Sequence, residues 1–435
     1  MFCLRTYTCF VCVYIHDLYV QAHKNVKYHC KSLAVCAIST IFAVLAASHR
    51  LREPKQKIAS GYSSPANLFV KYTTMKTDHL LIIRFSAQGE VAMLVPVVSS
   101  LARQYPDLRI TVLSRPFARP FFEELAPNVG FMGADLQGEY RGVTGLNALY
   151  RRLIAKNFTA IADMHNILSS RYLRMRFNLS RFRVEHIDRH VSERRRLTAQ
   201  KDKQLHQLPT AFENYTDVLA RLGYPVKVDF HSVFPPTGGN LRLVPEQIGE
   251  KKIFQQWIGV APFAIYKEKV YPPEKMEQVV AELIRRHPSC RVLLFGRTEA
   301  EQKVLDTWCA RYKECVNASA LLGSLQQELI VMSHLDVMLC MDSVNMHLAA
   351  LTGIRIVSVW GATHPFAGFL GWNHRMGDVV QVDMTCRPCS VFGNIPCMRG
   401  DNACMNAIDP ITIADSVERV LNELPKRVAT GGAAI

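Results

Sequence analysis

Hydrophobic positions along this chain form short continuous runs, and the segments between the runs repeat their apolar residues every three or four positions. Such runs are typical of buried strands, and the repeats are typical of amphipathic helices. The strand-like runs lie in two series, first at 80–85, 109–113 and 157–163, then at 258–262, 291–296, 336–340 and 356–360. Strands that alternate with helices predict doubly wound parallel sheets of the α/β class.

The two series predict two α/β domains joined by a Pro/Gly-rich connector. The expected parts are a leader at 1–74, an N-terminal domain at 75–238, a C-terminal domain at 239–425 and a tail at 426–435. Within the first domain a helix is predicted at 91–104. In the second, Asp409 and Pro410 predict the start of a closing helix at 411–424.

The junction that follows residues 336–340 has a pattern suited to an anion. Asp342 and Ser343 are N-cap residue types, and the helical pattern that follows them ends at Gly353. A helix N-terminus offers free backbone N–H groups and a positive dipole end to a phosphate, and His347 can face the same ligand. The alternative is that Asp342 and Ser343 only cap the helix and His347 is an ordinary helix residue.

Three other loops at strand ends carry polar candidates. Glu90 lies at a strand-to-helix turn, where it is either a general base for an acceptor hydroxyl or an acidic residue favoured by the helix dipole. Lys267 and Lys269 are either point charges for a diphosphate or solvated loop lysines. Thr298 and Glu299 either hold a ribose hydroxyl or form a helix cap.

Composition and charge narrow the class of protein. The 435 residues are 49% hydrophobic and 20% charged, which is typical of globular proteins, and their net charge is +15. Residues 1–74 hold 9 Lys/Arg and 2 Asp/Glu, which leaves a surplus of +8 for the rest. That surplus fits phosphate binding or an anionic bilayer surface and is too weak to indicate nucleic acid. The basic stretch 171–196 is either a solvated helix face and linker or a patch for an anionic acceptor or membrane.

The leader differs in composition from the rest of the chain. Residues 32–48 are an uncharged, mostly apolar run of 17 residues between Lys31 and Arg50. The run is a marginal membrane anchor, part of a cleaved signal peptide, or a product of a mis-assigned start, with translation beginning at Met75. Met75 directly precedes the first predicted strand, which favours the mis-assigned start.

The chain has 13 cysteines, and four of them form the cluster Cys386-x2-Cys389-x7-Cys397-x6-Cys404. The odd total and the isolated cysteines elsewhere argue against a secreted disulfide scaffold and favour a reducing compartment. The cluster holds a structural zinc, remains as reduced thiols packed in a loop, or forms a disulfide. Because it follows the junction at Asp342 in the chain, we expect its loop to shape the binding cleft.

Three separated motifs occur in a fixed order. Residues 84–96 contain a Gly-Glu turn with a downstream Pro, and residues 269–272 are Lys-Val-Tyr-Pro. Residues 341–350 are Met-Asp-Ser-Val-Asn-Met-His-Leu-Ala-Ala, and residues 361–365 are Gly-Ala-Thr-His-Pro. In this order they resemble the Gly-Asp turn, the Lys-x-Trp-Pro element, and the Asp-Thr-Gly-x-x-His-Leu-Ala and Gly-Pro-Thr-x-Pro pair of glycosyltransferase family 9, the lipopolysaccharide heptosyltransferases. The likeness covers about residues 75–425.

The resemblance implies a GT-B fold, in which two Rossmann-like domains bind the acceptor and an ADP-heptose-type donor. It also implies an inverting displacement in which Glu90 is the base and Lys269 neutralises the leaving diphosphate without a bound metal. The expected donor-binding residues are Lys267, Thr298, Glu299, Asp342, Ser343, Met346, His347 and Thr363.

Several positions depart from the family pattern. Glu90 stands where the family more often has Asp, Ser343 and Val344 replace Thr and Gly, and Ala362 and His364 alter the last element. These departures affect the expected identity of the donor sugar more than the expected class of reaction. We expect a glycosyltransferase at the cytoplasmic face of the inner membrane, peripherally associated, that adds a heptose or related sugar to a lipopolysaccharide core or lipid-linked acceptor. The alternatives are another GT-B nucleotide-sugar transferase, an epimerase, or a nucleotide-sugar-binding protein without turnover.

Overall fold

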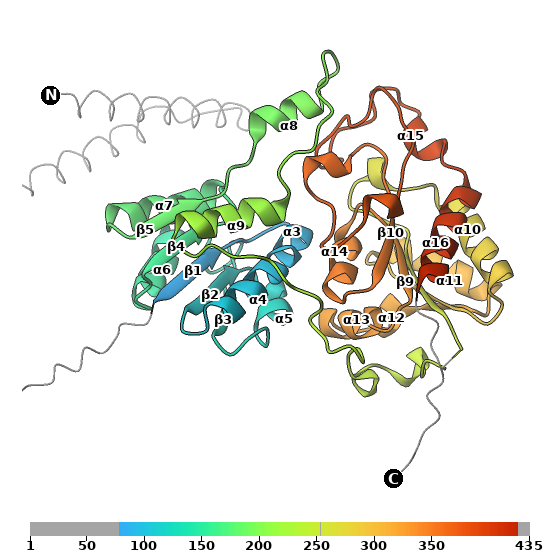
Figure 1. Ribbon diagram of the computed structural model, residues 1–435, viewed down its shortest axis with the longest axis horizontal. Helices are drawn as coiled ribbons and strands as arrows, with labels where there is room; N and C mark the ends of the chain where they lie inside the picture. The colour runs from blue at the N-terminus through green and yellow to red at the C-terminus, as the bar shows by residue number, and fades with distance from the viewer. Residues whose placement is uncertain (1–77, 253, 425–435) are drawn as a thin grey trace, which may run out of the picture. The chain divides into compact units, whose positions relative to one another are not determined.

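The computed structural model describes residues 78–252 and 254–424, which form two parallel sheets flanked by helices (Figure 1). The predictions for the leader, including the apolar run at 32–48 and the start at Met75, lie outside the described residues, as does the tail at 426–435. No helix in the described ranges has the length and apolar character needed to cross a bilayer.

The first sheet has five parallel strands in the order β3-β2-β1-β4-β5. Its strands are β1 (His79–Ile83), β2 (Arg109–Ser114), β3 (Val129–Gly133), β4 (Ala160–Asp163) and β5 (Arg183–His186). The accompanying helices are α3 (Gln88–Ala92), α4 (Leu94–Gln104), η1 (Pro116–Ala118), α5 (Arg119–Phe122), α6 (Gly142–Ile154), α7 (Leu168–Leu179), α8 (Val191–Leu197) and α9 (Ala211–Arg221). Ile83 is in register with both Leu113 and Asp163, so β1, β2 and β4 end at the same edge of the sheet.

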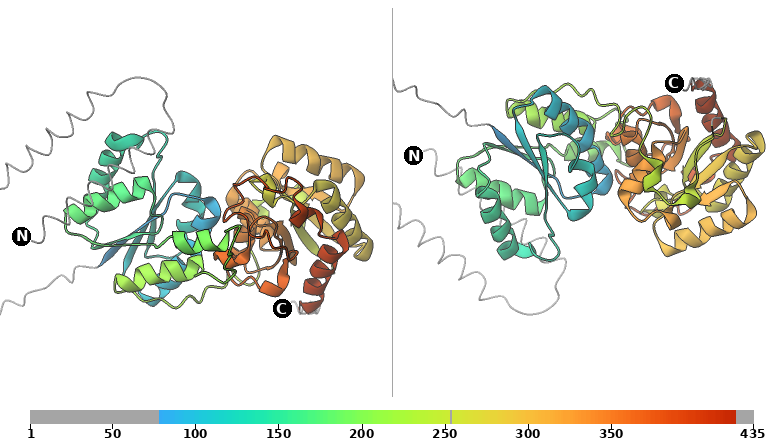
Figure 2. Two further views of the ribbon diagram at one scale, coloured as in Figure 1. Left: turned by 90° about the horizontal axis from the view of Figure 1, so that it is seen from above. Right: turned by 90° about the horizontal axis from the view of Figure 1, so that it is seen from below.

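Alternate side chains of β1 pack into two different clusters, one on each face of the sheet. Leu80 and Ile82 join a core cluster with α4 and α9, while Leu81 and Ile83 join a cluster with α6 and α7. Views from above and below show helices on both faces (Figure 2). The helix predicted at 91–104 begins earlier, at Gln88, and is divided at Met93 into α3 and α4. Glu90 therefore lies in the first turn of α3.

The second sheet has six parallel strands in the order β11-β10-β9-β6-β7-β8. Its strands are β6 (Trp257–Ala261), β7 (Arg291–Leu294), β8 (Cys315–Asn317), β9 (Val337–Met341), β10 (Arg355–Val359) and β11 (Val379–Val380). The accompanying helices are η2 (Leu241–Leu243), η3 (Glu246–Ile248), η4 (Lys267–Lys269), α10 (Pro273–Arg286), α11 (Glu299–Arg311), α12 (Ala318–Leu321), α13 (Leu325–Met332), α14 (Val344–Leu351), η5 (Pro365–Ala367), η6 (Met376–Asp378), α15 (Ala403–Asn406) and α16 (Pro410–Glu423). In the centre of this sheet, every residue of β6 and β9 and all but the first residue of β10 are buried, as their apolar composition predicts.

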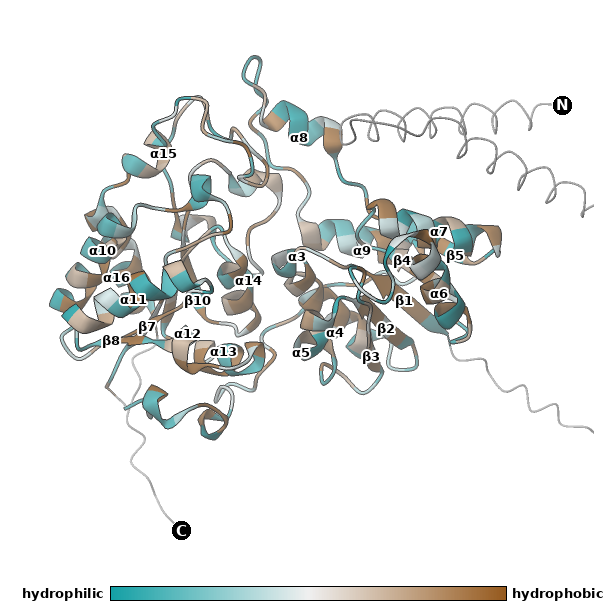
Figure 3. Cartoon of the chain, turned by 180° about the vertical axis from the view of Figure 1, so that it is seen from behind, coloured by the Kyte–Doolittle hydropathy of each residue, from teal (hydrophilic) through white to brown (hydrophobic). Residues whose placement is uncertain are grey.

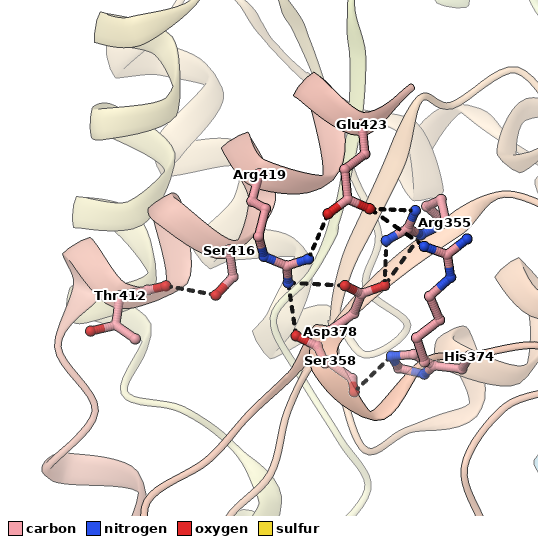
Figure 4. Close-up of polar contacts among 10 residues, drawn as sticks. Arg355, Ser358, His374, Asp378, Thr412, Ser416, Arg419 and Glu423 are labelled. Carbon is pink, nitrogen blue, oxygen red and sulfur yellow. Dashed lines mark hydrogen bonds and ion pairs between the residues drawn. The ribbon is translucent and has the colours of Figure 1, made fainter. Parts of the chain in front are cut away.

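The closing helix α16 starts as the sequence predicts and is tied to the sheet by ion pairs. The Asp409 carboxylate accepts a hydrogen bond from the Ile411 amide at 2.9 Å, and Pro410 is the first helical residue. At the other end, the buried Asp378 carboxylate lies 2.7 Å from Arg355 of β10 and 2.9 Å from Arg419 of α16 (Figure 4). This shared carboxylate joins α16 to β10 and to the segment that leads into β11.

A continuous apolar cluster includes residues of both sheets, among them Leu80 and Ile82 of β1 and Met346 and Leu348 of α14. Colouring by hydropathy shows the same pattern, with hydrophobic strands and more polar outer helices (Figure 3). The described residues belong to one compact unit. The domain boundary between residues 238 and 239 stays a prediction.

Candidate active site

Both sheets have a point at which the chain order reverses between neighbouring strands, at β1 and β4 in the first and at β6 and β9 in the second. Open α/β sheets bind ligands beyond the strand ends at this point, because the adjacent loops diverge there. A cavity of about 620 Å³ is lined by residues that follow all four of these strands. It brings together six of the predicted site residues, namely Glu90, Lys269, Thr298, Asp342, Ser343 and His347.

Glu90 is held in the cavity by a buried arginine and by the turn that begins α3. One carboxylate oxygen lies 2.7 Å from the Arg84 guanidinium, and the other accepts a hydrogen bond from the Ala87 amide at 3.2 Å. Arg84 also donates to the Met164 carbonyl and lies over the ring of Tyr215. The fixed guanidinium holds the Glu90 carboxylate at the cavity, which residues from the second sheet also line.

The protonation state of Glu90 is set by two opposing effects. Burial alone would raise the pKa of the Glu90 carboxyl, but Arg84 and the Ala87 amide outweigh burial, so the pKa lies below its ordinary value. Glu90 is therefore ionised at neutral pH. An ionised carboxylate next to a cavity is able to accept a proton from a bound hydroxyl group.

His165 follows β4 and lies beside the same turn in a neutral form. Its Nδ1 accepts a hydrogen bond from the Phe85 amide at 3.3 Å, and its Nε2 lies 3.3 Å from the Ser86 hydroxyl. The amide can only donate, so the ring proton is on Nε2. Burial and the Arg84 cation lower the pKa of His165 to about 3. His165 therefore contributes no positive charge to the cavity near pH 7.

The N-terminus of α14 has no side-chain cap. Asp342 and Ser343 were candidates for this role, but Ser343, the N-cap residue, makes no capping hydrogen bond and its buried hydroxyl has no partner among the described residues. The Nδ1 atom of His347 is also buried without a partner there. The first turn of α14 therefore faces the cavity with unused donors, as a site for an anionic ligand requires.

Asp342 is engaged with neighbouring side chains. Its Oδ2 atom accepts a hydrogen bond from the Thr363 hydroxyl at 2.8 Å and lies 3.3 Å from the Lys269 ammonium. A carboxylate repels a phosphate, so this position fits Asp342 for orienting Lys269 or binding sugar hydroxyls. The ammonium of Lys269 is thus placed in the cavity by a buried acid.

The loop that carries the cysteine cluster packs against Lys269, as its place in the sequence suggested. Gly393 has a φ of +78°, and a Cβ atom there would lie 2.5 Å from Cγ of Lys269. Val391 and Phe392 of the same loop line the cavity. Only glycine leaves room for the lysine stem at this point, so the loop fixes the path that Lys269 takes into the cavity.

Helices α3 and α14 meet at a second close approach. A Cβ atom on Gly89 would lie 2.6 Å from the His347 ring, so the imidazole packs directly on the α3 backbone beside Glu90. Burial lowers the pKa of His347 to about 4, with opposing contributions from Asp342 and Lys269. A neutral His347 on α14 therefore lies against α3, the helix that carries Glu90.

Four of the predicted donor residues do not line the cavity. Lys267 is solvent-exposed, and Glu299 lies on the exposed side of the first turn of α11. Met346 is fully buried in the apolar core. Thr363 reaches the site only through its hydrogen bond to Asp342. Strand-end position identified the loops correctly but did not identify which side chains face inward.

Thr298 lines the cavity but uses its hydroxyl as a helix cap. It accepts a hydrogen bond from the Glu301 amide at 3.3 Å, and the Glu301 carboxylate accepts from the Thr298 amide at 3.1 Å. This reciprocal pair is a capping box, which the spacing Thr-x-x-Glu was able to predict. The capping alternative given for Thr298 is therefore the one observed.

Arg194 of α8 was not among the predicted site residues. Its guanidinium lies 4.8 Å from the ring centre of Phe369 and 5.7 Å from that of Phe392, and both rings line the cavity. Within the described ranges its side chain forms no ion pair or hydrogen bond, and its Nε is buried. Burial lowers the pKa of Arg194, and Glu90 opposes that shift. The only sequence signal was its place in the basic stretch 171–196.

The four clustered cysteines line a separate small cavity of about 20 Å³. Cys386, Cys389, Cys397 and Cys404 are free thiols in the structure. Over the described residues no group of three or more His, Cys, Asp or Glu side chains is arranged to hold a metal ion, so this arrangement gives no support to zinc, one of the three alternatives for the cluster. Burial raises the pKa of Cys389 and of Cys404, which keeps both protonated near pH 7.

Comparison with known proteins identifies the same fold elsewhere. A model of glycosyltransferase family 9 (heptosyltransferase) matches residues 146–395. No curated protein sequence matches the chain. The glycosyl transferase family 9 protein from Veillonella parvula DSM 2008 matches with a TM-score of 0.58 and 16% identity, over 80% of this chain and 98% of that one.

Two E. coli enzymes of solved structure are similar to the same extent. ADP-heptose lps heptosyltransferase II matches with a TM-score of 0.56 and 17% identity, over 79% of this chain and 99% of that one. Heptosyltransferase WaaC with ADP matches with a TM-score of 0.56 and 15% identity, over the same shares. These likenesses confirm the predicted α/β GT-B fold class. Because the family model spans more than half of the 435 residues, the chain belongs to glycosyltransferase family 9, the heptosyltransferase family.

Proposed function

We propose that the protein is an inverting glycosyltransferase that moves a heptose, or a related sugar, from an ADP-sugar to a lipopolysaccharide core or another lipid-linked acceptor. One observation carries the proposal. A single cavity holds an ionised carboxylate from the first sheet opposite a lysine and an uncapped helix N-terminus from the second. Membership of the family and the similarity to E. coli ADP-heptose lps heptosyltransferase II support this choice of donor.

In the proposed reaction an acceptor hydroxyl attacks the anomeric carbon of the donor sugar. The new carbon–oxygen bond forms on the face opposite the diphosphate, and the bond from the anomeric carbon to the diphosphate oxygen breaks, which inverts the configuration. Glu90 accepts the proton that the hydroxyl loses. Arg84 keeps the carboxylate ionised until the transfer, because the pair lowers the pKa of Glu90.

The leaving diphosphate gains negative charge as its bond to the sugar breaks. Lys269 and the free N–H groups at the start of α14 stabilise this negative charge, while Asp342 holds the Lys269 ammonium in place. The family resemblance leads us to propose that the transfer uses no cofactor. Phe263, Ile265 and Phe295 form an apolar part of the cavity wall that suits a nucleobase.

Because the proposed acceptor is attached to a lipid and the proposed donor is a nucleotide sugar, we propose that the enzyme acts at the cytoplasmic face of the inner membrane. Incubation of the full chain with ADP-heptose carrying a labelled sugar and heptose-deficient lipopolysaccharide tests the activity. We expect labelled product with inverted anomeric configuration, determined by NMR. A screen in which no ADP-sugar or other nucleotide sugar donates to any lipid-linked acceptor would contradict the proposal.

A Glu90→Gln variant separates an enzyme from a binding protein. The substitution keeps the side-chain size and removes the base, so we expect kcat to fall by about 10²–10⁴-fold. Donor affinity, measured by calorimetry, should change little because Glu90 is opposite the donor-facing groups. Glu299→Gln is the matched control, since that exposed carboxylate lies outside the cavity. Equal rates for Glu90→Gln and the parent would assign the base to another group.

A further inference from the structure

The helices that cover one face of the first sheet belong to a strongly basic part of the chain. Residues 140–184 contain nine Lys/Arg and a single acidic residue, Asp163. That acid is fully buried and is paired with Arg174 at 3.3 Å. The exposed part of this segment therefore carries only positive charge. Few surfaces of globular proteins have such a one-sided composition, because mixed charges are the usual arrangement.

This segment contains α6, β4, α7 and the start of β5, and its two helices lie side by side on one face of the sheet (Figures 1 and 3). The Tyr172 hydroxyl of α7 donates to Asn147 of α6 at 2.8 Å, and the Tyr150 hydroxyl lies 2.7 Å from Ser180. Their inner side chains pack against Leu81 and Ile83 of β1. The two helices therefore present one joined outer face.

The outer face combines exposed apolar side chains with the basic ones. On α7, Leu168 is 62% exposed, Met175 45% and Leu179 75%. Their spacing of seven and then four residues places all three on one side of the helix, with exposed Arg171 between them. On α6, exposed Val143 and Ile154 accompany exposed Arg151 and Arg152, and exposed Lys156 follows two residues after the helix.

We propose that this α6–α7 face binds the surface of an anionic lipid bilayer. Basic side chains contact acidic headgroups, and apolar side chains on the same face enter the boundary between headgroups and acyl chains. The charge fits a bilayer with acidic lipids, and the aliphatic residues distinguish it from nucleic acid. A phosphate backbone offers nothing for Leu168, Met175 and Leu179 to contact.

The α6–α7 face lies near the end of the first sheet that carries the candidate active site. Both helices start at the carboxyl edge of the sheet, and Leu168 is three residues after His165, which lines the cavity. A bilayer on this face would lie near the edge of the sheet where the reaction is proposed. Binding to the bilayer does not itself depend on the proposed transfer, so each is tested separately.

The test measures sedimentation of the full chain with vesicles of phosphatidylethanolamine and phosphatidylglycerol, and with vesicles of phosphatidylcholine alone. We expect binding to the acidic vesicles that weakens with salt, and much weaker binding to phosphatidylcholine. The variant Arg151→Gln with Lys156→Gln should bind the acidic vesicles about fivefold more weakly for each charge removed. Lys303→Gln with Lys313→Gln removes two exposed charges from the second sheet's side as the control.

A second variant tests the apolar contribution. Leu168→Ser, Met175→Ser and Leu179→Ser together should reduce binding by about tenfold or more, because apolar area no longer enters the bilayer. Ile411→Ser on α16 is the matched control for an exposed aliphatic residue. Unchanged circular dichroism in all variants excludes unfolding as the cause.

Three results would overturn the proposal. If the variants of the α6–α7 face bind acidic vesicles as tightly as the parent, any membrane contact lies elsewhere in the chain. Tighter binding to a duplex oligonucleotide than to acidic vesicles, lost in the Arg151 and Lys156 variant, would assign the face to nucleic acid. A dimer in solution that dissociates when Leu168, Met175 and Leu179 are replaced would assign it to a second copy of the chain.

Discussion

Arg84 and Glu90 form an ion pair in which the base is partly exposed and the cation is almost completely enclosed. The guanidinium is fixed by the Met164 carbonyl and the Tyr215 ring, and the Tyr215 hydroxyl donates to the Glu90 carbonyl at 3.1 Å. A rigid cation determines the basicity of its partner more reliably than a solvated one. In the proposed reaction Arg84 therefore acts through the Glu90 carboxylate.

Removing that cation should change the pH dependence of transfer. In Arg84→Met burial is no longer outweighed, so the pKa of Glu90 rises. Because the proposed reaction uses Glu90 as the ionised base, the acid limb of the kcat profile should move to higher pH. Arg84→Lys keeps a charge and should shift the limb less. An unmoved limb in a folded Arg84→Met protein, checked by thermal unfolding, would separate Arg84 from the base.

Arg194 is predicted to bind an anionic group of the acceptor. Its guanidinium lies against Phe369 and Phe392 without an ion-pair partner in the described part of the chain. Arg194→Gln should raise the acceptor KM by about tenfold, the effect of one charged hydrogen bond, and leave donor affinity almost unchanged. Arg195→Gln, on an exposed part of the same helix, is the control. A rise in donor Kd instead would assign Arg194 to the diphosphate.

At the scale of elements, the cysteine-containing loop and the loop after β6 meet at Gly393 and Lys269. A Gly393→Ala variant places a methyl group against the lysine stem. We expect kcat to fall by about tenfold or more, because small displacements of a charged group are costly to catalysis. Gly400→Ala isolates the backbone effect, since Gly400 has a similar φ of +77° and nothing within 4 Å. Equal losses in both variants would mean that the contact with Lys269 has no influence.

The sequence predicted the inner strands of both sheets because each is a short apolar run. It did not predict the outer strands β3, β5, β8 and β11, which are very short or contain glycine and polar residues. It also placed Glu90, Lys269 and Asp342 at strand ends that the topology brings to one edge. The residue types alone did not distinguish Lys269 from Lys267, because both occupy the same short 3₁₀ helix. The Lys-Val-Tyr-Pro motif singled out Lys269, and its contacts with Asp342 and Gly393 give it a defined position.

Other site residues were beyond sequence reasoning for a different reason. Phe392 lines the cavity from a loop that does not directly follow a central strand, and Arg194 reaches the site only through its contacts with Phe369 and Phe392. Asp342 looked like a cap because its residue type favours one, yet Thr363 and Lys269 engage its carboxylate instead. The pattern of a local motif does not reveal competition from residues that are distant in the chain.

At the scale of the whole molecule, several buried histidines are neutral. Burial lowers the pKa of His165 to about 3, and that of His347, His364 and His374 to about 4. The unfolded chain binds protons near the ordinary value of 6.5, so their contribution to stability is present above that pH and is lost as the pH falls toward 4.

Thermal unfolding should therefore show a falling midpoint between pH 7 and pH 5. Linkage gives a loss of about 2 kcal/mol for a histidine such as His374 over this range. A His374→Gln variant should have a shallower dependence on pH than the parent, since it lacks one of the titrating groups. A midpoint that stays constant down to pH 5 would contradict the buried neutral state of these rings.

The uncapped start of α14 has a consequence for the evolution of the chain. The Ser343 hydroxyl and the His347 Nδ1 each lack a partner among the described residues, and each such buried atom costs about 1–3 kcal/mol of stability. Ser343→Ala should thus raise the melting temperature of the ligand-free protein while reducing the stabilisation that a donor gives. A relative that no longer binds a donor would be free to gain stability by replacing this serine. The residue at position 343 would therefore indicate whether a relative still binds its donor.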